Sequence, residues 1–302
     1  MSRESDFIAR LRGFATHPAA RGLFDDAAVL PFAGRDLVLT HDVIVEGVHF
    51  LASDPPQDVA WKLVAVNLSD LAAKGAHPLG VLLGFPLGDA GWDAAFADGL
   101  EQVLARYDTP LLGGDTIAGA GPRQFGLTAI GETAPGAAPA RSGAVAGDIV
   151  YVTGTIGAAG RGLAIARGAQ AGPDACLAAY RRPTPRLAEG RLLAPQAHAM
   201  ADISDGLLID AARMAAASRI AIEIDLDTVP IADGVDDRMA GMIAGDDYEL
   251  LVAAPGRLTI RQPGLAQITA IGRCVAGAGL ALFAQGSPVP LPPSLGYEHD
   301  TV

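Results

Sequence analysis

Hydrophobic residues in the first half of the chain follow two alternating spacings. Segments 37–40, 43–50, 81–87 and 125–131 are rich in Val, Ile, Leu or Phe and predict strands. Segments 57–74 and 92–107 carry apolar residues at about helical spacing and predict helices. Gly75 suits the left-handed position that commonly ends a helix.

The second half begins after a segment, 133–143, that is rich in Ala, Pro and Gly and predicts a connecting loop. We therefore place a domain boundary near residue 137, which gives domains 1–137 and 138–302. Strands are predicted at 148–153, 220–226 and 249–253, a helix at 162–168, and a strand end, turn and helix over 203–217. Helices and strands mix without strict βαβ order, which favours the α+β class.

Composition limits the partners that the chain can have. Half of its 302 residues are hydrophobic and 19% are charged, which favours extensive burial, including a subunit interface. A net charge of −12 argues against non-specific nucleic-acid binding. The polar start is no signal peptide, and no apolar run approaches the ~20 residues that span a bilayer. With only two distant cysteines, Cys176 and Cys274, we expect a reduced, cytoplasmic protein without nucleic-acid or membrane partners.

Carboxylates recur at predicted strand ends and turns within apolar surroundings. They are Asp25, Asp26, Asp42, Asp70, Asp115, Asp202, Asp205, Asp246 and Asp247. Aspartate is rarely buried unless it is paired or bound to a metal. Divalent cations would also let an acidic protein bind a polyphosphate, because they bridge carboxylate and phosphate oxygens.

A polar stripe interrupts the apolar helix predicted at 57–74. Asn67, Asp70 and Lys74 lie at spacings of three and four residues and share one helical face. Two interpretations stay open: a functional site, or a solvated face with an Asp70–Lys74 surface pair.

Two further acidic motifs have simple structural explanations beside functional ones. Gly113 and Gly114 could let a backbone approach a phosphate, with Asp115 holding a metal, but a plain turn is the commoner explanation. Ser204 or Asp205 can N-cap the helix that follows them. Asp210, further along that helix, is predicted to be exposed.

Several nucleotide-binding motifs are absent from the sequence. Lys62 and Lys74 are the only lysines, and no G-x-x-x-x-G-K-[ST] occurs, so a Walker P-loop is excluded. Protein-kinase motifs are missing as well. The Gly-rich segment 153–160 lacks a lysine and predicts a flexible turn between a strand and a helix.

Eight segments, taken in order, resemble the thiamine-monophosphate kinase family, whose superfamily includes aminoimidazole ribonucleotide synthetase and selenophosphate synthetase. They are DDAAVL (25–30), DVIVEGVHF (42–50), AVNLSDLAAKGAHP (65–78), GGDT (113–116), RSGAVAGDIVYVTG (141–154), RRPTPRLAEGRLL (181–193), DISDGLLID (202–210) and AGDDYEL (244–250). The segments span nearly the whole chain, and DVIVEGVHF favours this family over its relatives.

The resemblance implies a two-domain α+β fold like that of aminoimidazole ribonucleotide synthetase. A four-stranded N-terminal sheet would pair with its copy in a homodimer, and ATP and Mg²⁺ would bind between the domains. The implied reaction is phosphorylation of thiamine monophosphate by ATP, through direct in-line transfer without a general base.

The resemblance also assigns roles to residues. The implied metal ligands are Asp26, Thr40, His41, Asp42, Asp70, Asp115, Asp202 and Asp205; the ATP contacts are Gly114, Asp115, Arg141 and Ser204; the substrate contacts are His49, Asp246 and Tyr297. Phe24, His41, Asp246 and Asp300 depart from the family pattern, and Asp246 and Asp300 bear most on substrate geometry. His41 could still present its backbone carbonyl to a metal.

Rival interpretations come from several classes of protein. A selenophosphate synthetase normally has a reactive residue near its N-terminus, whereas no cysteine here precedes Cys176. A cyclo-ligase of the same superfamily and a non-catalytic nucleotide-binding relative are two further rivals. The simplest rival is an α+β dimer in which every one of these aspartates only caps a helix or lies in a turn.

Overall fold

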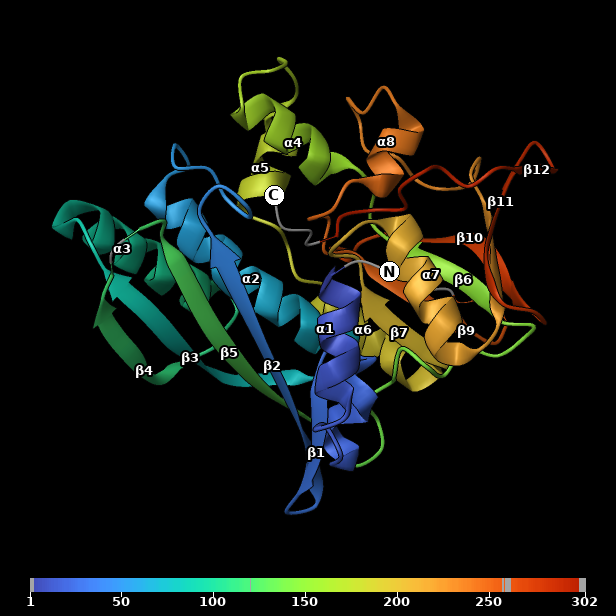
Figure 1. The fold of residues 1–302 in the computed structure, drawn as a ribbon, viewed down its shortest axis with the longest axis horizontal. Helices are drawn as coiled ribbons and strands as arrows, with labels where there is room; N and C mark the ends of the chain where they lie inside the picture. Colours follow the sequence, from blue (N-terminus) through green and yellow to red (C-terminus); the bar gives the residue numbers. More distant parts are fainter. Residues whose placement is uncertain (1–2, 120, 257, 259–261, 299–302) are drawn as a thin grey trace.

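The computed structural model describes residues 3–119, 121–256, 258 and 262–298, and two β-sheets with their helices dominate it (Figure 1). The N-terminal part contains α1 (Arg3–Arg12), the 3-10 helix η1 (Pro18–Leu23), β1 (Ala28–Phe32), β2 (Arg35–Val45), α2 (Pro56–Ala73), β3 (His77–Leu87), α3 (Ala90–Arg106), β4 (Leu111–Ala118) and β5 (Gln124–Thr133).

These strands form a five-stranded sheet in the order β1-β2-β5-β3-β4. It has one strand more than the resemblance implies, because β1 pairs with β2 as an antiparallel hairpin. The predicted strand 43–50 is wrong beyond Val45, since residues 47–49 turn and only an isolated bridge joins Glu46 to Phe50. Residues 113–116 lie within β4 and do not form a plain turn.

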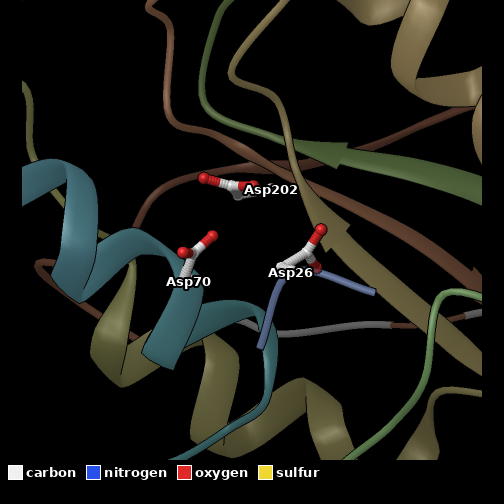
Figure 2. A group of neighbouring side chains, drawn as sticks. All are labelled: Asp26, Asp70 and Asp202. Atoms are coloured by element: carbon white, nitrogen blue, oxygen red, sulfur yellow. The ribbon is translucent and has the colours of Figure 1, made fainter. Parts of the chain in front are cut away.

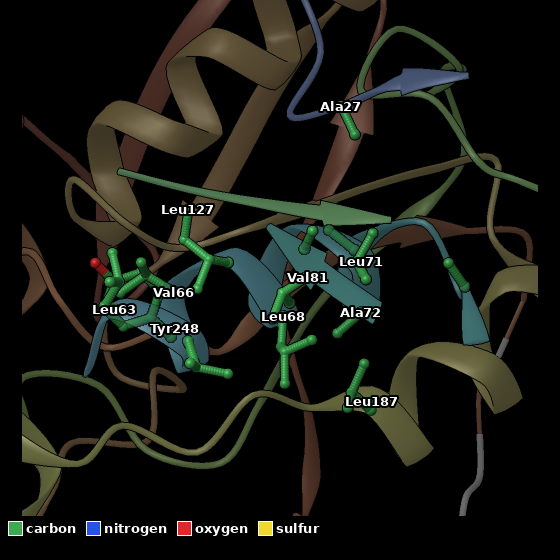
Figure 3. Close-up of a cluster of buried hydrophobic side chains, with 14 of the residues drawn as sticks. Ala27, Leu63, Val66, Leu68, Leu71, Ala72, Val81, Leu127, Leu187 and Tyr248 are labelled. Carbon is green, nitrogen blue, oxygen red and sulfur yellow. The ribbon is translucent and has the colours of Figure 1, made fainter. Parts of the chain in front are cut away.

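Helix α2 matches the predicted range 57–74 almost to the residue, and it ends as expected, with Gly75 at φ 61°. Its apolar side chains face in every direction, which is typical of a helix buried on all sides. Figure 3 shows this packing: Leu63, Val66 and Leu68 of α2 lie among Leu127 of β5 and Leu187 of the C-terminal part. The helix therefore forms the shared core between the two parts of the chain.

The C-terminal part is built on a second sheet. Its elements are β6 (Ile149–Thr153), α4 (Ala158–Ala166), α5 (Asp174–Arg181), α6 (Leu187–Leu193), η2 (Ala194–Gln196), β7 (Ala199–Asp202), α7 (Leu207–Ser218), β8 (Ala221–Asp225), α8 (Arg238–Ile243), β9 (Leu250–Ala254), β10 (Ile268–Val275), β11 (Gly279–Ala284) and β12 (Ser287–Val289). The strand order is β12-β11-β8-β10-β6-β9-β7, antiparallel except for β8 and β11.

The predicted strands of this part match β6, β8 and β9 within one residue at each end. The helix predicted at 162–168 begins earlier, at Ala158, so the end of the Gly-rich segment 153–160 is helical. The boundary near residue 137 falls between β5 and β6 and stays a prediction. No helix in the described part of the chain combines the length and hydropathy needed to cross a bilayer.

Candidate active site

A cleft of about 620 Å³ lies between the two sheets, beside α2. Most of the residues that the sequence singled out line it: Asp42, His49, Asp70, Asp202, Ser204, Asp205, Asp246 and Tyr297. They come from both parts of the chain, so the folded cleft brings together segments that are far apart in sequence.

Three carboxylates meet at one end of this cleft. Oxygens of Asp26, Asp70 and Asp202 all lie within 4.8 Å of one another (Figure 2). Asp26 precedes β1, Asp70 lies on α2 and Asp202 ends β7. Three hard oxygen ligands at this spacing are what a divalent cation such as Mg²⁺ prefers. We call this group, with Asp42 beside it, the metal end of the cleft.

Hydroxyl groups orient two of these carboxylates. Thr40 on β2 donates a short hydrogen bond to Asp70, and Ser69 Oγ donates to Asp202 Oδ2 at 2.7 Å. The polar stripe on α2 is thus no solvated face: Asp70 lines the cleft, and Asn67 and Lys74 are buried. The alternative Asp70–Lys74 surface pair is wrong, because Lys74 is fully buried and pairs with Asp25 and Asp26 instead.

Burial, and then an excess of negative charge, raises the pKa of most carboxyls at the metal end. Burial, then Asp26 and Asp205, raise the pKa of Asp42 to about 6. Burial and the neighbouring carboxylates also raise the pKa values of Asp70 and Asp202 well above the ordinary value. Burial likewise acts to raise the pKa of Asp26, but Arg141 and Lys74 outweigh it, so the pKa is lowered. This group therefore needs cations before all members can ionise.

Ion pairs leave part of this group unbalanced. Asp26 Oδ2 is buried, and its partner among the described residues is Lys74 Nζ at 2.8 Å. Asp70 and Asp202 have no ion pair within the described residues and receive hydroxyl hydrogen bonds instead. Buried carboxylates without a cation are costly. The residues present therefore fit a divalent cation.

The loop after β7 is held by Asp210, a residue for which the sequence predicted exposure. Asp210 is fully buried, not exposed, and its Oδ2 accepts the backbone N–H groups of Ser204 and Asp205, each at 3.1 Å. The predicted N-cap by Ser204 or Asp205 is wrong, because Gly206 occupies that position without a side-chain cap. Arg213 bonds both Asp205 and Asp210 and completes this bracing.

Another part of the cleft lining contains the three predicted substrate contacts, His49, Asp246 and Tyr297, and we call it the acceptor end. Lys62 Nζ on α2 lies 2.7 Å from Asp246 Oδ2 and 2.8 Å from the His49 carbonyl oxygen. Tyr248 Oη donates to Asp246 Oδ1 at 3.1 Å. Tyr297 is half exposed at the cleft, and its N–H donates to the Asp205 carbonyl.

The loop that presents Asp246 has a constrained backbone. Asp246 and Tyr248 both adopt positive φ, 71° and 51°, in a region that residues other than glycine rarely occupy. Their N–H groups donate to the carbonyls of Ser204 and Ile203, at 2.7 and 2.8 Å. Such conformations persist where surrounding structure enforces them, often at functional sites.

The structure does not bring every predicted residue to the cleft. The His41 side chain lies on the opposite face of β2 from Thr40 and contacts Thr128 Oγ1 at 2.9 Å. Gly114 and Asp115 lie on the edge strand β4, outside the cleft lining. A Cβ on Gly114 would lie 1.9 Å from the Leu83 carbonyl oxygen, so strand packing alone explains this glycine.

Arg141 does not line the cleft, but its guanidinium group donates a hydrogen bond to the carboxylate of Asp26. Phe24 is exposed and stacks under Arg12, and Asp300 lies outside the described residues.

No role in the cleft was predicted for Lys62 from the sequence. The available signal was a lysine within an apolar stretch of α2, which predicts either a snorkelling side chain or a buried ion pair.

Comparisons with known proteins agree on the family. The models of AIR synthase related protein match residues 24–133 for the N-terminal domain and 145–285 for the C-terminal domain. The thiamine-monophosphate kinase of Caulobacter vibrioides is 39% identical over 98% of this chain and 90% of its own length.

Solved structures give the same result. The structure of AaThiL complexed with AMPPCP and TMP has a TM-score of 0.85 at 29% identity and covers 97% of this chain and 96% of that chain. The thiamine-monophosphate kinase of Stenotrophomonas maltophilia K279a has a TM-score of 0.75 at 36% identity over 94% and 96% of the two chains. With its carboxylate cleft and these matches along nearly its whole length, the chain belongs to the thiamine-monophosphate kinase family.

Proposed function

We propose that this chain transfers the γ-phosphoryl group of ATP to the phosphate of thiamine monophosphate and forms thiamine diphosphate. The observation that carries the proposal is the clustering of Asp26, Asp70 and Asp202 from both parts of the chain in one cleft. Its support from relatives is the AaThiL complex, which contains AMPPCP and TMP.

The acceptor needs little chemical activation. A phosphate ester has a second pKa near ~6, so its nucleophilic oxygen is mostly ionised at neutral pH. The chain must therefore place two polyanions in line and neutralise their charge, without a general base or a phospho-enzyme. His49, Asp246 and Tyr297 at the acceptor end would orient the substrate, and Ser204 with Arg141 would contact ATP.

The residues that would hold Mg²⁺ are Asp26, Asp42, Asp70 and Asp202, with Thr40 and Asp205 beside them. When bound, Mg²⁺ supplies charge neutralisation to the phosphates. Thr40 and Ser69 keep two of the carboxylates oriented toward the cleft. Arg141 adds a fixed guanidinium behind Asp26, and its planar fork suits carboxylate and phosphate oxygens.

A homodimer is part of the proposal. All eight residues of β4 are exposed at the sheet edge, including Leu112 at 54% and Ile117 at 59%. Leu82 is also exposed on neighbouring β3. Apolar side chains on an open sheet edge favour association with another chain. Since Asp115 lies on β4, its predicted metal role requires that it reach the cleft of a partner copy.

A cytoplasmic location is proposed as well. Cys176 and Cys274 are both buried free thiols, as expected of a chain that folds in a reducing compartment.

The test is a product assay with purified protein, ATP, Mg²⁺ and thiamine monophosphate. Thiamine and aminoimidazole ribonucleotide precursors serve as control acceptors. We expect ADP and thiamine diphosphate in equal amounts, only with thiamine monophosphate and only with a divalent metal. Turnover of a control acceptor in preference to thiamine monophosphate would refute the assignment.

A further inference from the structure

The chain has only two lysines, Lys62 and Lys74, and both lie buried at α2, Lys62 within the helix and Lys74 at its C-cap. Their side chains are 2% and 0% exposed. Lysine is almost never fully buried unless it is paired, so each ammonium group must have a specific task. Lys62 serves the acceptor end, through Asp246, whereas Lys74 faces the metal end.

Lys74 is surrounded by oxygen atoms. Its Nζ forms a short ion pair with Asp25 and lies 2.8 Å from Asp26 Oδ2. It also donates to the Met200 carbonyl oxygen on β7 at 3.1 Å. The ammonium group is a compact point charge surrounded by hard oxygens, which is also the environment that a metal ion prefers.

Positive charge is distributed unevenly around the carboxylates of the metal end. Asp25 pairs with Arg21 at 2.5 Å as well as with Lys74, and Asp26 pairs with Arg141 as well as with Lys74. Within the described residues, Asp70 and Asp202 form no ion pair at all and receive hydroxyl hydrogen bonds. The chain thus provides its own cations on the Asp25–Asp26 side only.

We propose that Lys74 is a resident cation of the metal end: it keeps Asp25 and Asp26 together without metal, and it competes with divalent cations for Asp26. The inference deepens the proposed function and rests on its metal site. Mg²⁺ binding in this protein is consequently weaker than the carboxylate set alone would give, and the metal-free site is better ordered. Lys74 is a positioning residue, since it acts through Asp26.

A purely structural role for Lys74 makes a different prediction. As a tether between α2 and β7, it would stabilise the protein equally with and without Mg²⁺. As a resident cation, it takes charge that a metal would otherwise supply, so its removal must increase the response to Mg²⁺.

The experiment compares Lys74→Met with Lys62→Met, which removes a similarly buried lysine from the same helix at the other end of the cleft. Metal-free proteins are titrated with Mg²⁺ alone by calorimetry, and melting temperatures are measured with and without Mg²⁺. For Lys74→Met we expect Mg²⁺ to bind about tenfold more tightly than to wild type, because a unit charge acts strongly at this range in a buried site. The melting temperature should fall without metal and recover with it. Lys62→Met should keep the wild-type Mg²⁺ affinity.

Equal Mg²⁺ affinities in wild type and Lys74→Met, or no Mg²⁺ binding to Lys74→Met, would overturn the inference. The same applies if Lys62→Met tightens binding as much as Lys74→Met. Should Lys74→Met fail to fold, Lys74→Gln, which can still bond the Met200 carbonyl, is measured with the same criteria. The titration contains neither nucleotide nor acceptor, so its result stands apart from the kinase assay: tighter Mg²⁺ binding in a protein that does not phosphorylate thiamine monophosphate would refute the proposed function alone.

Discussion

The two ends of the cleft treat their carboxylates in opposite ways. At the acceptor end, both oxygens of Asp246 are bonded by the chain itself, through Lys62 and Tyr248. At the metal end, Asp70 and Asp202 face each other within 4.8 Å and have no ion pair among the described residues. The acceptor end is electrostatically complete as folded, whereas the metal end is not.

This difference shows which part of the site depends on added cations. Like charges at short distance raise the pKa of carboxyls and destabilise the fold unless a cation joins them. We therefore expect changes at the metal end to alter metal binding and turnover, and changes at the acceptor end to alter recognition of one substrate. The predictions below test that division.

The largest effect is expected for Asp70→Asn at the metal end. Loss of one ligand should lower turnover by about 100-fold or more, because metal-bound charge stabilises the transferring group by several kcal/mol. Without metal, the melting temperature should stay level or rise, since one member of a repelling group becomes neutral. Turnover with excess Mg²⁺ and thermal unfolding in chelator are the measurements.

Asp98→Asn, which changes an exposed aspartate on α3, is the control and should leave both quantities unchanged. Near-normal turnover in Asp70→Asn would exclude α2 from the metal site. The family assignment would then have to be defended from Asp42 and Asp202.

The second prediction concerns the partner copy. Ile117→Arg places a charge on the exposed edge strand β4 and should weaken the dimer by about 100-fold, because burying an unpaired charge costs several kcal/mol. If Asp115 of a partner completes the metal end, turnover must fall together with the dimer. Light scattering and turnover over a range of protein concentrations measure both.

Leu291→Arg, at a similarly exposed apolar residue after β12, should leave the mass and the turnover unchanged. If the Ile117→Arg protein were monomeric and fully active, Asp115 of a partner copy could not be a required ligand of the metal end. A wild-type protein that is monomeric at micromolar concentration would contradict the homodimer.

The sequence predicted the clustered carboxylates of the metal end better than the residues that hold them in place. Asp26, Asp70 and Asp202 could be predicted because carboxylates in apolar surroundings and in family motifs need a common partner. The burial of Asp210 could not, because helical spacing gives only its place along α7. Spacing does not show that the preceding loop folds back and offers two N–H groups to its carboxylate.

Predictions from the sequence were less accurate for residues on β-strands. Thr40 and His41 are neighbours in sequence, but side chains alternate across a sheet, so only Thr40 reaches Asp70. The turn expected at Gly113 and Gly114 is a strand, because β3 supplies hydrogen bonds that glycine propensity does not reveal. The positions of Lys62 and Lys74 depend on contacts with Asp246 and Met200 of the C-terminal part, which spacing along one helix cannot show.

The third prediction is that a change at the acceptor end raises the KM for one substrate and not for the other. Lys62→Met removes the cation that fixes Asp246 and should raise the KM for thiamine monophosphate about tenfold or more, since hydrogen bonds to charged groups contribute roughly 1.5–3 kcal/mol. The KM for ATP should stay close to wild type. Lys74→Met is the matched comparison and should leave the acceptor KM unchanged. Equal increases of both KM values in Lys62→Met would show a general loss of structure instead of a role in acceptor recognition.

The last prediction concerns Asp247, whose carboxylate accepts hydrogen bonds at the start of α4. Its oxygens accept N–H groups of Gly157 at 2.7 Å and Ala159 at 3.3 Å. Burial raises the pKa of Asp247 to about 8 despite these bonds, from an ordinary value of 3.8. Between those values the folded chain binds more protons than the unfolded chain, so this stabilisation is complete below pH 3.8 and is lost as the pH rises to 8.

We expect the free energy of unfolding of wild type to fall more steeply than that of Asp247→Asn between about pH 5 and 8, by up to about 1 kcal/mol per pH unit. Urea unfolding of both metal-free proteins across this range measures the difference. Parallel curves would mean that Asp247 stays ionised throughout, and that the N–H groups at the start of α4 dominate over burial.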